Sequence, residues 1–505
     1  MYRNFTLTLL FIISVIFEVS SQITPAEALM QMGRGINLGN TLEPPDEGGW
    51  NNGPAQEYYF DAYEKAGFKT VRIPVRWDEH TMTTSPYHVY DTWMDRVEEV
   101  VDWALKRDLF VIINAHHEQW LKDNYADPAI RARFDSIWVQ IAERFKDKSD
   151  SLFFEIINEP KGLTQSQIDD LNGRILGIIR KTNPTRIVVY SGNEWSNSDQ
   201  LMAAKIPDDD YIMGYFHSYN PWSFAGQGEG TWGTEADKKA IRDKFQIVGD
   251  WAKQNNLAIM ISEFGAVKTC DYNSRMHHYA FYVENSMINN IPFMAWDDGG
   301  SFAIYMRSSD SWNEIKDILI HFYPESPSDL VLSADGNKVK LAWQNRATYK
   351  KLIIERGTSS IRLDTIAEIS TDATYYDDVV EYGYTKYYYR LKAELDDGTV
   401  VYSYPARIYV GSTAIKKRTV SDVSIFPNPV TGNELNLRSD FFITGVEYNY
   451  SIYSITGQKL FSNGAVANSP ILKIDLSNSN LKPGIYFLQV KGNETNALSL
   501  KFFVK

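Results

Sequence analysis

Short runs of large apolar residues recur along the chain between residues 30 and 300. One of them, Leu152–Asn158, is rich in aromatic and β-branched residues and does not alternate between apolar and polar positions. Such a run predicts a strand that is buried on both faces, as in a parallel sheet. It ends in Glu159 and Pro160, and a second run of the same kind, Leu257–Glu263, also ends in a glutamate. Two buried strands that each end in glutamate suggest a pair of working carboxyl groups.

Strand-like runs alternate with helical patterns in this part of the chain. Apolar residues recur at helical spacing in Asp91–Lys106, Ile168–Arg180 and Asp243–Asn255. Eight units of strand and helix in about 300 residues predict a (β/α)8 TIM barrel. An open doubly wound sheet is the alternative, but it would usually show a glycine-rich loop after its first strand. The eight expected strands are Gly35–Gly39, Lys69–Val75, Phe110–Ala115, Leu152–Asn158, Arg186–Ser191, Tyr211–His217, Leu257–Glu263 and Pro292–Asp297.

Polar and aromatic residues collect at the carboxyl ends of these expected strands. In a barrel all eight ends meet at one rim, where the catalytic residues of such enzymes lie. The sequence therefore predicts an active site at this rim. The residues are Asn40, Glu43, Arg72, Arg76, His116, His117, Asn158, Glu159, Glu194, Trp195, His217, Tyr219, Glu263, Trp296 and Asp297.

Charge and cysteine usage limit the possible partners. The formal net charge of -13 argues against a nucleic-acid or anionic-membrane partner, which would require a basic face. The single cysteine, Cys270, excludes an internal disulfide. Met1–Gln22 has a short start with Arg3 and an apolar run over Leu9–Phe17 that is too short to stay in a bilayer. We expect a secretory signal peptide that is cleaved after Ser21, and contact with membranes only during export.

The remaining 180 or so residues are predicted to be all β. Helical periodicity is lost after a Pro-rich segment at residues 324–327, and short strands such as Lys351–Arg356 and Tyr387–Ala393 follow, as in a β-sandwich. With its core Trp343, this module resembles a fibronectin type III domain. The segments Phe426–Pro429, Ile452–Gln458 and Leu481–Tyr486 together resemble the C-terminal sorting domain of the type IX secretion system.

The barrel motifs occur in an order that resembles glycoside hydrolase family 5, the cellulase-type retaining hydrolases. The resemblance implies that Glu159 is the general acid/base and Glu263 the nucleophile. It also implies that Glu159 is protonated at rest, with a pKa raised by the nearby anion, and that Arg72 and Tyr219 keep Glu263 ionised. The motifs are Gly35–Glu43, Val71–Val75, Asn114–His117, Asn158–Pro160, His217–Tyr219, Glu263–Gly265 and Trp296.

The other positions that match the family are expected to bind sugar. Asn158 would donate to the 2-hydroxyl at the cleavage point, and Trp296 would form a stacking platform. Trp50 and Trp222 are expected to be structural. Adjacent histidines beside Glu118 could form a metal site instead, but we expect no metal and no cofactor, because neighbouring side chains at a strand end tend to diverge. The expected substrate-binding residues are Asn40, Glu43, Arg72, His116, His117, Asn158, Trp195, His217, Tyr219, Trp232 and Trp296.

The sequence thus predicts a secreted or cell-surface, monomeric endo-β-1,4-glucanase that acts on cellulose-type β-glucan. The alternatives are a β-1,4-mannanase or glucomannanase of the same family, and a surface glycan-binding protein without catalysis. The expected segments are a signal peptide at 1–21, a TIM barrel at 22–325, a fibronectin-like sandwich at 326–411, a linker at 412–424 and a secretion sorting sandwich at 425–505, which would contact the secretion machinery.

Overall fold

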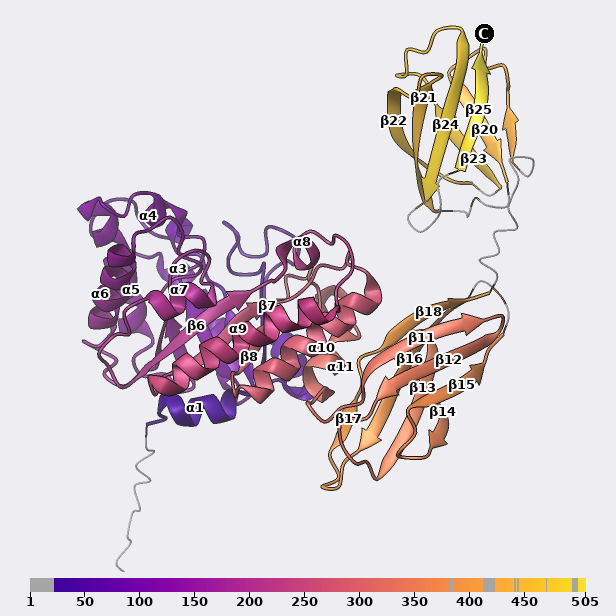
Figure 1. Cartoon of the computed structure of the whole chain (residues 1–505). Helices are drawn as coiled ribbons and strands as arrows, with labels where there is room; N and C mark the ends of the chain where they lie inside the picture. The colour runs from indigo at the N-terminus through magenta and orange to yellow at the C-terminus, as the bar shows by residue number, and fades with distance from the viewer. Residues whose placement is uncertain are drawn as a thin grey trace, which may run out of the picture. The chain divides into compact units, whose positions relative to one another are not determined.

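The computed structural model describes residues 22–381, 383, 385–411, 423–439, 442, 445–468, 470–492 and 498–505. The signal peptide expected at 1–21 lies outside the described residues, as do residues 412–422 of the expected linker. The chain divides into two compact units, of which the first holds the barrel with the module that follows it and the second holds the C-terminal module. Figure 1 labels many of the elements of both.

Eight parallel strands close into a barrel in sequence order, and β1 pairs with β8 to complete the ring. The predicted TIM barrel is therefore confirmed, although the strands are mostly shorter than the apolar runs. Their bounds are β1 (Arg34–Asn37), β2 (Thr70–Ile73), β3 (Phe110–Asn114), β4 (Leu152–Glu155), β5 (Val188–Tyr190), β6 (Ile212–Ser218), β7 (Ala258–Phe264) and β8 (Phe293–Ala295).

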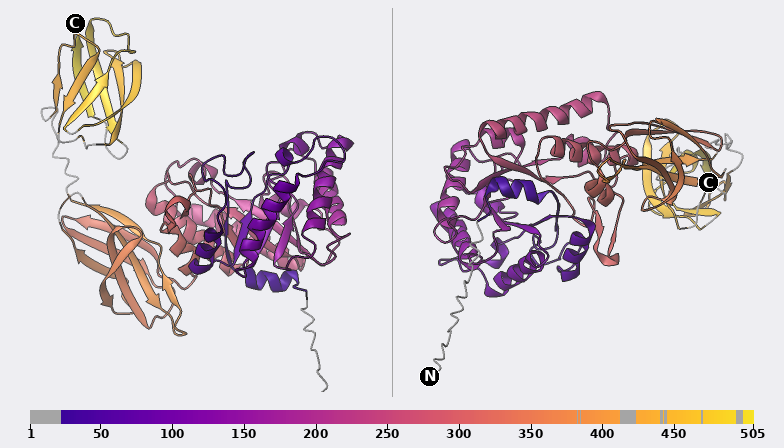
Figure 2. Two further views of the ribbon diagram at one scale, coloured as in Figure 1. Left: turned by 180° about the vertical axis from the view of Figure 1, so that it is seen from behind. Right: turned by 90° about the horizontal axis from the view of Figure 1, so that it is seen from below.

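Helices surround the barrel, as the view in the right panel of Figure 2 shows. In one of them, Asp91–Leu105, the buried residues include Trp93, Val97, Val101 and Ala104, which is the spacing of a single apolar stripe. The helices are α1 (Pro25–Met32), α2 (Glu57–Ala66), α3 (Asp91–Leu105), α4 (Gln119–Asp123), α5 (Pro128–Arg144), α6 (Gln165–Ile179), α7 (Ser198–Ala203), α8 (Trp222–Ala225), α9 (Glu235–Gln254), α10 (Tyr272–Ile288) and α11 (Ile315–His321).

The inside of the barrel is filled by side chains and is closed at one end by α1. Ala28 and Met32 of this helix pack against Phe110, Phe153 and Met260, which point inward from the strands. The amino-terminal end of the barrel is therefore sealed, and the carboxyl ends of the strands form the open rim. Two short 3-10 helices and a hairpin complete this part of the chain: η1 (Asp78–His80), β9 (Tyr305–Met306), η2 (Arg307–Ser309) and β10 (Ser311–Trp312).

The module after the barrel packs two antiparallel sheets over a core that includes Trp343 and Tyr389. Arg390 binds Asp317 of α11 at 2.6 Å, and Arg346 binds Glu284 of α10 at 2.8 Å, so this module is docked on the barrel. The strands are β11 (Ser328–Asp335), β12 (Lys338–Gln344), β13 (Lys351–Ser359), β14 (Arg362–Ile369), β15 (Tyr375–Val379), β16 (Thr385–Glu394), β17 (Val400–Tyr402) and β18 (Ala406–Val410).

The C-terminal module is a second two-sheet sandwich, with sheets β19-β20-β23 and β22-β21-β24-β25. Its core includes Leu435, Tyr450, Leu488 and Phe502. The predicted fold class, a barrel followed by two all-β modules, is therefore confirmed. The strands are β19 (Ser424–Phe426), β20 (Glu434–Arg438), β21 (Glu447–Ser454), β22 (Lys459–Val466), β23 (Ile471–Asp475), β24 (Gly484–Gly492) and β25 (Leu498–Val504).

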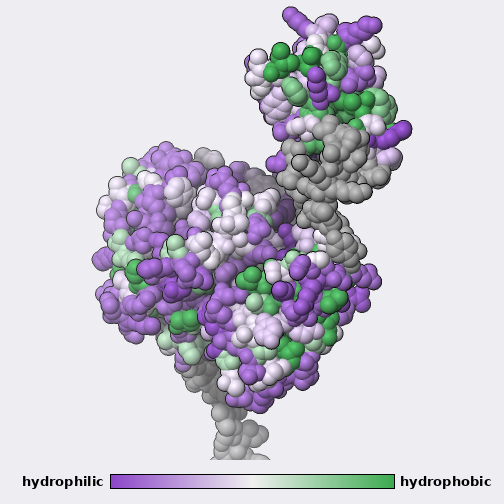
Figure 3. Space-filling model, turned by 45° about the vertical axis from the view of Figure 1, so that its right-hand side comes forward, coloured by the Kyte–Doolittle hydropathy of each residue, from purple (hydrophilic) through white to green (hydrophobic). Residues whose placement is uncertain are grey.

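Most of the face visible in Figure 3 is hydrophilic, and its apolar residues form small groups. None of the described helices is both long enough and apolar enough to cross a membrane.

Candidate active site

A cleft of about 1100 Å³ opens at the carboxyl ends of the barrel strands. Most of the residues predicted for the site line it, and Arg72 lies directly beneath them as a buried part of its floor. The predicted residues in the lining are Asn40, Glu43, Arg76, His116, His117, Asn158, Glu159, Glu194, Trp195, His217, Tyr219, Glu263 and Trp296.

Glu159 follows β4 and Glu263 lies near the end of β7, and the two carboxyl groups face each other across His217 of β6. One oxygen of each glutamate and one ring nitrogen of His217 all lie within 4.8 Å of one another. His217 Nδ1 is 2.9 Å from Glu159 Oε1 and 3.6 Å from Glu263 Oε2. The fold thus brings together two acids that are about 100 residues apart in the sequence.

Glu263 is held by donors at both of its oxygens. Arg72 Nη1 donates to Oε1 at 2.6 Å, and the Tyr219 hydroxyl donates to Oε2 at 2.9 Å. Arg72 Nη2 also donates to Asn158 Oδ1 at 2.7 Å, which leaves the Asn158 amide nitrogen as the donor for a ligand in the cleft. The carboxylate and the amide are therefore fixed relative to each other by one guanidinium.

The pKa values of the two acids shift in directions opposite to the predicted ones. Burial raises the pKa of Glu263, against the opposing effects of His217 and Arg72. Burial also acts to raise the pKa of Glu159, but the hydrogen bond and charge of His217 override it and lower this pKa. The reason is that His217 Nδ1 lies closer to Glu159 than to Glu263. Because the two acids share this imidazole, they titrate as a pair rather than one by one.

A second group of polar residues lines the cleft beside the first. Burial raises the pKa of Glu43 to about 8, although its Oε1 accepts the Asn40 N–H at 2.7 Å. Its Oε2 has no hydrogen-bond partner and lies 3.7 Å from His116 Nε2. Burial also lowers the pKa of His117 to about 4, so that its ring is neutral near pH 7.

Glu43, His116 and His117 are close enough together to be considered as metal ligands. The hydrogen bonds around His116 do not fit this role. Asn114 Nδ2 can only donate, and it lies 3.1 Å from His116 Nδ1, so the neutral ring carries its proton on Nε2. That nitrogen faces Glu43 as a donor, and a metal would require a lone pair there. The group is suited to binding hydroxyls.

Aromatic rings line the cleft, but not all of the predicted ones. Trp195 is 50% exposed, whereas Trp232 is only 5% exposed and packs against His277, His278 and Phe281. The structure therefore corrects the prediction for Trp232, whose loop turns the ring into the core beside α10. Trp50 and Trp222, which we expected to be structural, are both half-exposed and line the cleft together with Trp120 and Phe302.

Three further polar residues take part in the site without having been predicted. Glu155 on β4 pairs with Arg72 inside the barrel, at 2.6 and 2.7 Å. Ser262 Oγ lies 3.0 Å from His217 Nε2. Lys122 of α4 donates to the Asn158 carbonyl at 2.9 Å. Glu155 could have been found in the sequence because it is the one charged residue in the apolar run Leu152–Asn158. Ser262 and Lys122 give no such signal.

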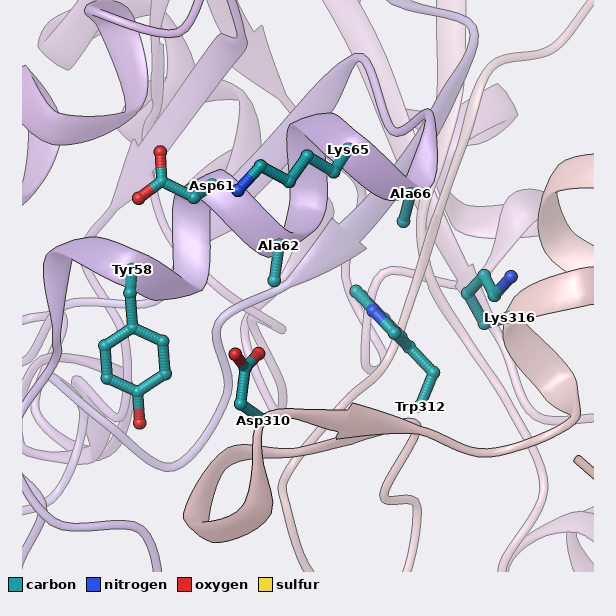
Figure 4. A pocket seen from close by; sticks show the side chains of 8 residues that line it. All are labelled: Tyr58, Asp61, Ala62, Lys65, Ala66, Asp310, Trp312 and Lys316. Carbon is teal, nitrogen blue, oxygen red and sulfur yellow. The ribbon is translucent and has the colours of Figure 1, made fainter.

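A smaller hollow of about 370 Å³ lies away from this site, between α2 and the β9-β10 hairpin (Figure 4). Its lining carries both signs of charge, with Asp61 and Asp310 opposing Lys65 and Lys316. Asp61 is already bound to Arg107, and Asp310 accepts from the Tyr305 hydroxyl. The paired carboxyl groups and the imidazole of the main cleft have no counterpart here.

Comparison with known families gives two matches in separate parts of the chain. The model for cellulase (glycosyl hydrolase family 5) matches residues 31–300. The model for the secretion system C-terminal sorting domain matches residues 424–505. The first match covers the barrel with every strand end described above, and the second covers the C-terminal sandwich.

Curated relatives agree with the first match. The chain is 46% identical over 298 residues to Endoglucanase H of Acetivibrio thermocellus, an alignment that covers 58% of this chain and only 33% of that protein. It is 32% identical over 365 residues to Endoglucanase A of Clostridium longisporum, covering 63% of this chain and 70% of the relative.

Solved structures show the same fold. Thermotoga maritima Cel5A in complex with mannotriose is 34% identical, with a TM-score of 0.57, and the match covers 59% of this chain and 100% of that one. A tri-modular endo-β-1,4-glucanase from Bacillus licheniformis covers 96% of this chain and 100% of its own, with a TM-score of 0.71. At 24% identity the latter supports the architecture alone.

Proposed function

This chain belongs to glycosyl hydrolase family 5, and we propose that its barrel is an endo-acting β-1,4-glucanase that works by double displacement through a glycosyl-enzyme intermediate. The single observation that carries the mechanism is the approach of the two glutamates, whose nearest oxygens are no more than 4.8 Å apart. Retaining glycosidases hold their two carboxyl groups about 5 Å apart, whereas inverting enzymes leave room for a water molecule at about 6.5–9.5 Å.

In the first step Glu263 is the nucleophile. One of its oxygens forms a bond to the anomeric carbon while the bond from that carbon to the glycosidic oxygen breaks. Glu159, which at this point carries the single proton that the two carboxyl groups share, passes it to the departing oxygen, which leaves as a hydroxyl of the shortened chain. Arg72 and Tyr219 support this role because they fix both oxygens of Glu263.

In the second step water replaces the leaving group. Glu159, now ionised, takes one proton from the water, the water oxygen bonds to the anomeric carbon, and the ester bond to Glu263 breaks. His217 supports the change of roles because its Nδ1 contacts Glu159 and lies near Glu263. The imidazole can therefore interact with either carboxyl group, whichever of the two carries the single proton that the pair shares.

The rest of the cleft suits a neutral polysaccharide. Trp296 and the exposed Trp195 offer faces on which pyranose rings stack, while Asn40, Glu43, His116 and His117 offer groups for hydroxyls. Asn158 is suited to the 2-hydroxyl at the cleavage point, because Arg72 occupies its carbonyl oxygen and leaves the amide to donate.

Cellulose-type β-glucan is the proposed substrate because the curated relatives above are named endoglucanases. β-Mannan is the second candidate. Thermotoga maritima Cel5A has been solved with mannotriose and also with cellobiose, at 34% and 33% identity to this chain. Reducing-sugar release from soluble cellulose, xyloglucan, xylan and mannan by the purified enzyme separates the candidates. Binding to any of these glycans without release would instead favour the glycan-binding alternative.

The chemistry is tested at the two carboxyl groups. We expect Glu159→Gln and Glu263→Gln to abolish hydrolysis of soluble cellulose while the folded state persists by circular dichroism. A 2-fluoro cellobioside should leave a mass adduct on Glu263 in the wild type and none in Glu263→Gln. An adduct elsewhere, or near wild-type activity in either variant, would contradict the assignment.

The C-terminal sorting domain makes this an exported protein, secreted or held at the cell surface. Delivery outside the cell agrees with a polymeric substrate that cannot enter. We propose that the sandwich at residues 424–505 is the part that the secretion machinery contacts.

A further inference from the structure

The backbone at Glu159 adopts a left-handed conformation, with φ of 44°. This conformation costs a residue with a side chain about 1–2 kcal/mol, so neighbouring groups must hold it in place. The Glu159 N–H donates to the Tyr215 hydroxyl at 3.3 Å. On the other side of the same peptide, Lys122 Nζ donates to the Asn158 carbonyl at 2.9 Å. The peptide that precedes the acid/base residue is thus held at both its oxygen and its nitrogen.

Lys122 belongs to the short helix α4 and is buried, yet it lines the cleft. An ammonium group in such a place requires a nearby negative charge. Its neighbours among carboxyl groups are Glu118, Glu159 and Asp123. Burial raises the pKa of Glu118 to about 8, so Glu118 is mainly uncharged at neutral pH and below. Asp123 is exposed to solvent, so the negative charge that remains for Lys122 inside the cleft is that of Glu159.

We propose that Lys122 is a positioning residue for Glu159 and acts on it in two ways. It holds the 158–159 peptide in place. Its charge also favours the ionised carboxyl group of Glu159 and so sets the alkaline limit of catalysis. The proposal rests on the function given above, in which the active enzyme carries one proton on the pair of glutamates. Loss of that proton ends acid catalysis, and a nearby cation makes the loss easier.

Several other groups face Glu159 from the elements around it, and Lys122 is the one that can be changed most selectively. Arg72 is already bound to Glu155 and Glu263, and His217 contacts both catalytic acids. Among the described residues, Lys122 forms no hydrogen bond with either catalytic carboxyl group. The groups that interact electrostatically with Glu159 are Arg72, His117, Lys122, His217, Tyr219 and Glu263.

The test is the pH profile of kcat/KM on cellotetraose for the wild type, Lys122→Met and Lys122→Arg. Loss of the cation should move the alkaline limb of Lys122→Met to higher pH by about one unit, and Lys122→Arg should restore the wild-type limb. The control is Lys106→Met, which removes a lysine that is 76% exposed on the outside of the barrel and should leave the limb in place. Lys122→Gln serves as the second uncharged variant if Lys122→Met does not fold.

A lower rate at every pH with an unmoved limb would show that Lys122 is merely structural and would overturn the proposal. A limb that moves to lower pH would overturn it as well. Failure of the proposed function is a separate result, because the wild type would then lack a bell-shaped profile or Glu159→Gln would remain active.

Discussion

Glu155 holds the guanidinium of Arg72 by two hydrogen bonds, from Nε at 2.7 Å and from Nη2 at 2.6 Å, inside the barrel and out of contact with solvent. The same guanidinium reaches Glu263 through Nη1 at 2.6 Å. One positive charge is therefore divided between two carboxylates. This division helps to explain why burial is able to raise the pKa of Glu263 although an arginine lies beside it.

Replacing Glu155 by Gln should shift the acidic limb of the pH profile to lower pH. Without the charge of Glu155, Arg72 acts on Glu263 alone and favours the ionised nucleophile, so the enzyme stays active in more acidic solution. The measurement is kcat/KM between pH 3 and pH 7. Glu284→Gln is the matched control, because it removes another buried, arginine-paired glutamate, which lies on α10, binds Arg346 of the following module and does not line the cleft. An acidic limb that stays in place or moves upward would contradict the charge-sharing account.

The barrel could be predicted from the sequence because its evidence is local. A strand buried on both faces must be apolar throughout, and the polar residues that follow must lie at the rim. Contacts between side chains of different strands inside the barrel leave a much weaker signal in the sequence. Glu155 interrupts the apolar run of β4, yet nothing in the sequence says that Arg72 of β2 lies opposite it.

Exposure of the tryptophans could not be predicted for a related reason. Trp195, Trp222 and Trp232 all follow barrel strands and sit in polar, glycine-containing or turn-rich segments. Which ring faces the cleft depends on the path of each loop against the neighbouring helices. Trp232 packs against the rings of His277 and Phe281 on α10 and is buried, whereas Trp195 contacts Lys161, whose Nζ lies 4.0 Å from its ring centroid, and stays half-exposed.

These two tryptophans should respond oppositely to truncation. Trp195→Ala should raise KM for cello-oligosaccharides about tenfold, equal to about 1.4 kcal/mol of binding, with little change in melting temperature. Trp232→Ala should leave KM near the wild-type value and lower the free energy of unfolding by about 3–5 kcal/mol, as expected for a large side chain removed from a core. Kinetics and thermal unfolding of both variants check this. A large rise in KM for Trp232→Ala would show that Trp232 binds substrate after all.

Gly39 is needed just after the end of β1, where the backbone passes close to Trp296. A Cβ atom on Gly39 would lie 2.8 Å from the Asp297 carbonyl oxygen and 3.0 Å from two carbons of the Trp296 ring. Gly39→Ala should therefore displace the stacking platform and lower kcat/KM by about tenfold to a hundredfold, the cost of misplacing a substrate by about 1 Å. Gly173→Ala is the control, since its Cβ would meet nothing within 4 Å on α6. Unchanged kinetics in Gly39→Ala would mean that Trp296 does not position the substrate.

Deletion of residues 425–505 should separate export from catalysis. The deleted chain retains the barrel and the sandwich docked on it, so its activity on soluble cellulose should be unchanged after cell lysis. Export should fail, because the sorting domain is missing, and the activity should be found in the periplasm instead of at the cell surface or in the medium. Fractionation of producing cells measures this. The same distribution with and without these residues would contradict a sorting role.

Glu118 should make the barrel less stable as the pH rises. Burial raises its pKa in the folded protein to about 8 from an ordinary value of 4.5, so between these values the folded state binds one more proton than the unfolded chain does. Its contribution to the free energy of unfolding is therefore full below pH 4.5 and is lost as the pH rises toward 8, by up to about 1.4 kcal/mol per pH unit. Glu118→Gln keeps the shape of the side chain and cannot ionise, so the stability of this variant should fall less steeply over this window in urea titrations at pH 5, 6, 7 and 8.

The raised pKa of Glu43 is common to both proteins and cancels in the comparison. Glu79→Gln, with a side chain that is 55% exposed, should follow the wild-type slope, and equal slopes in wild type and Glu118→Gln would show that Glu118 is ionised in the fold.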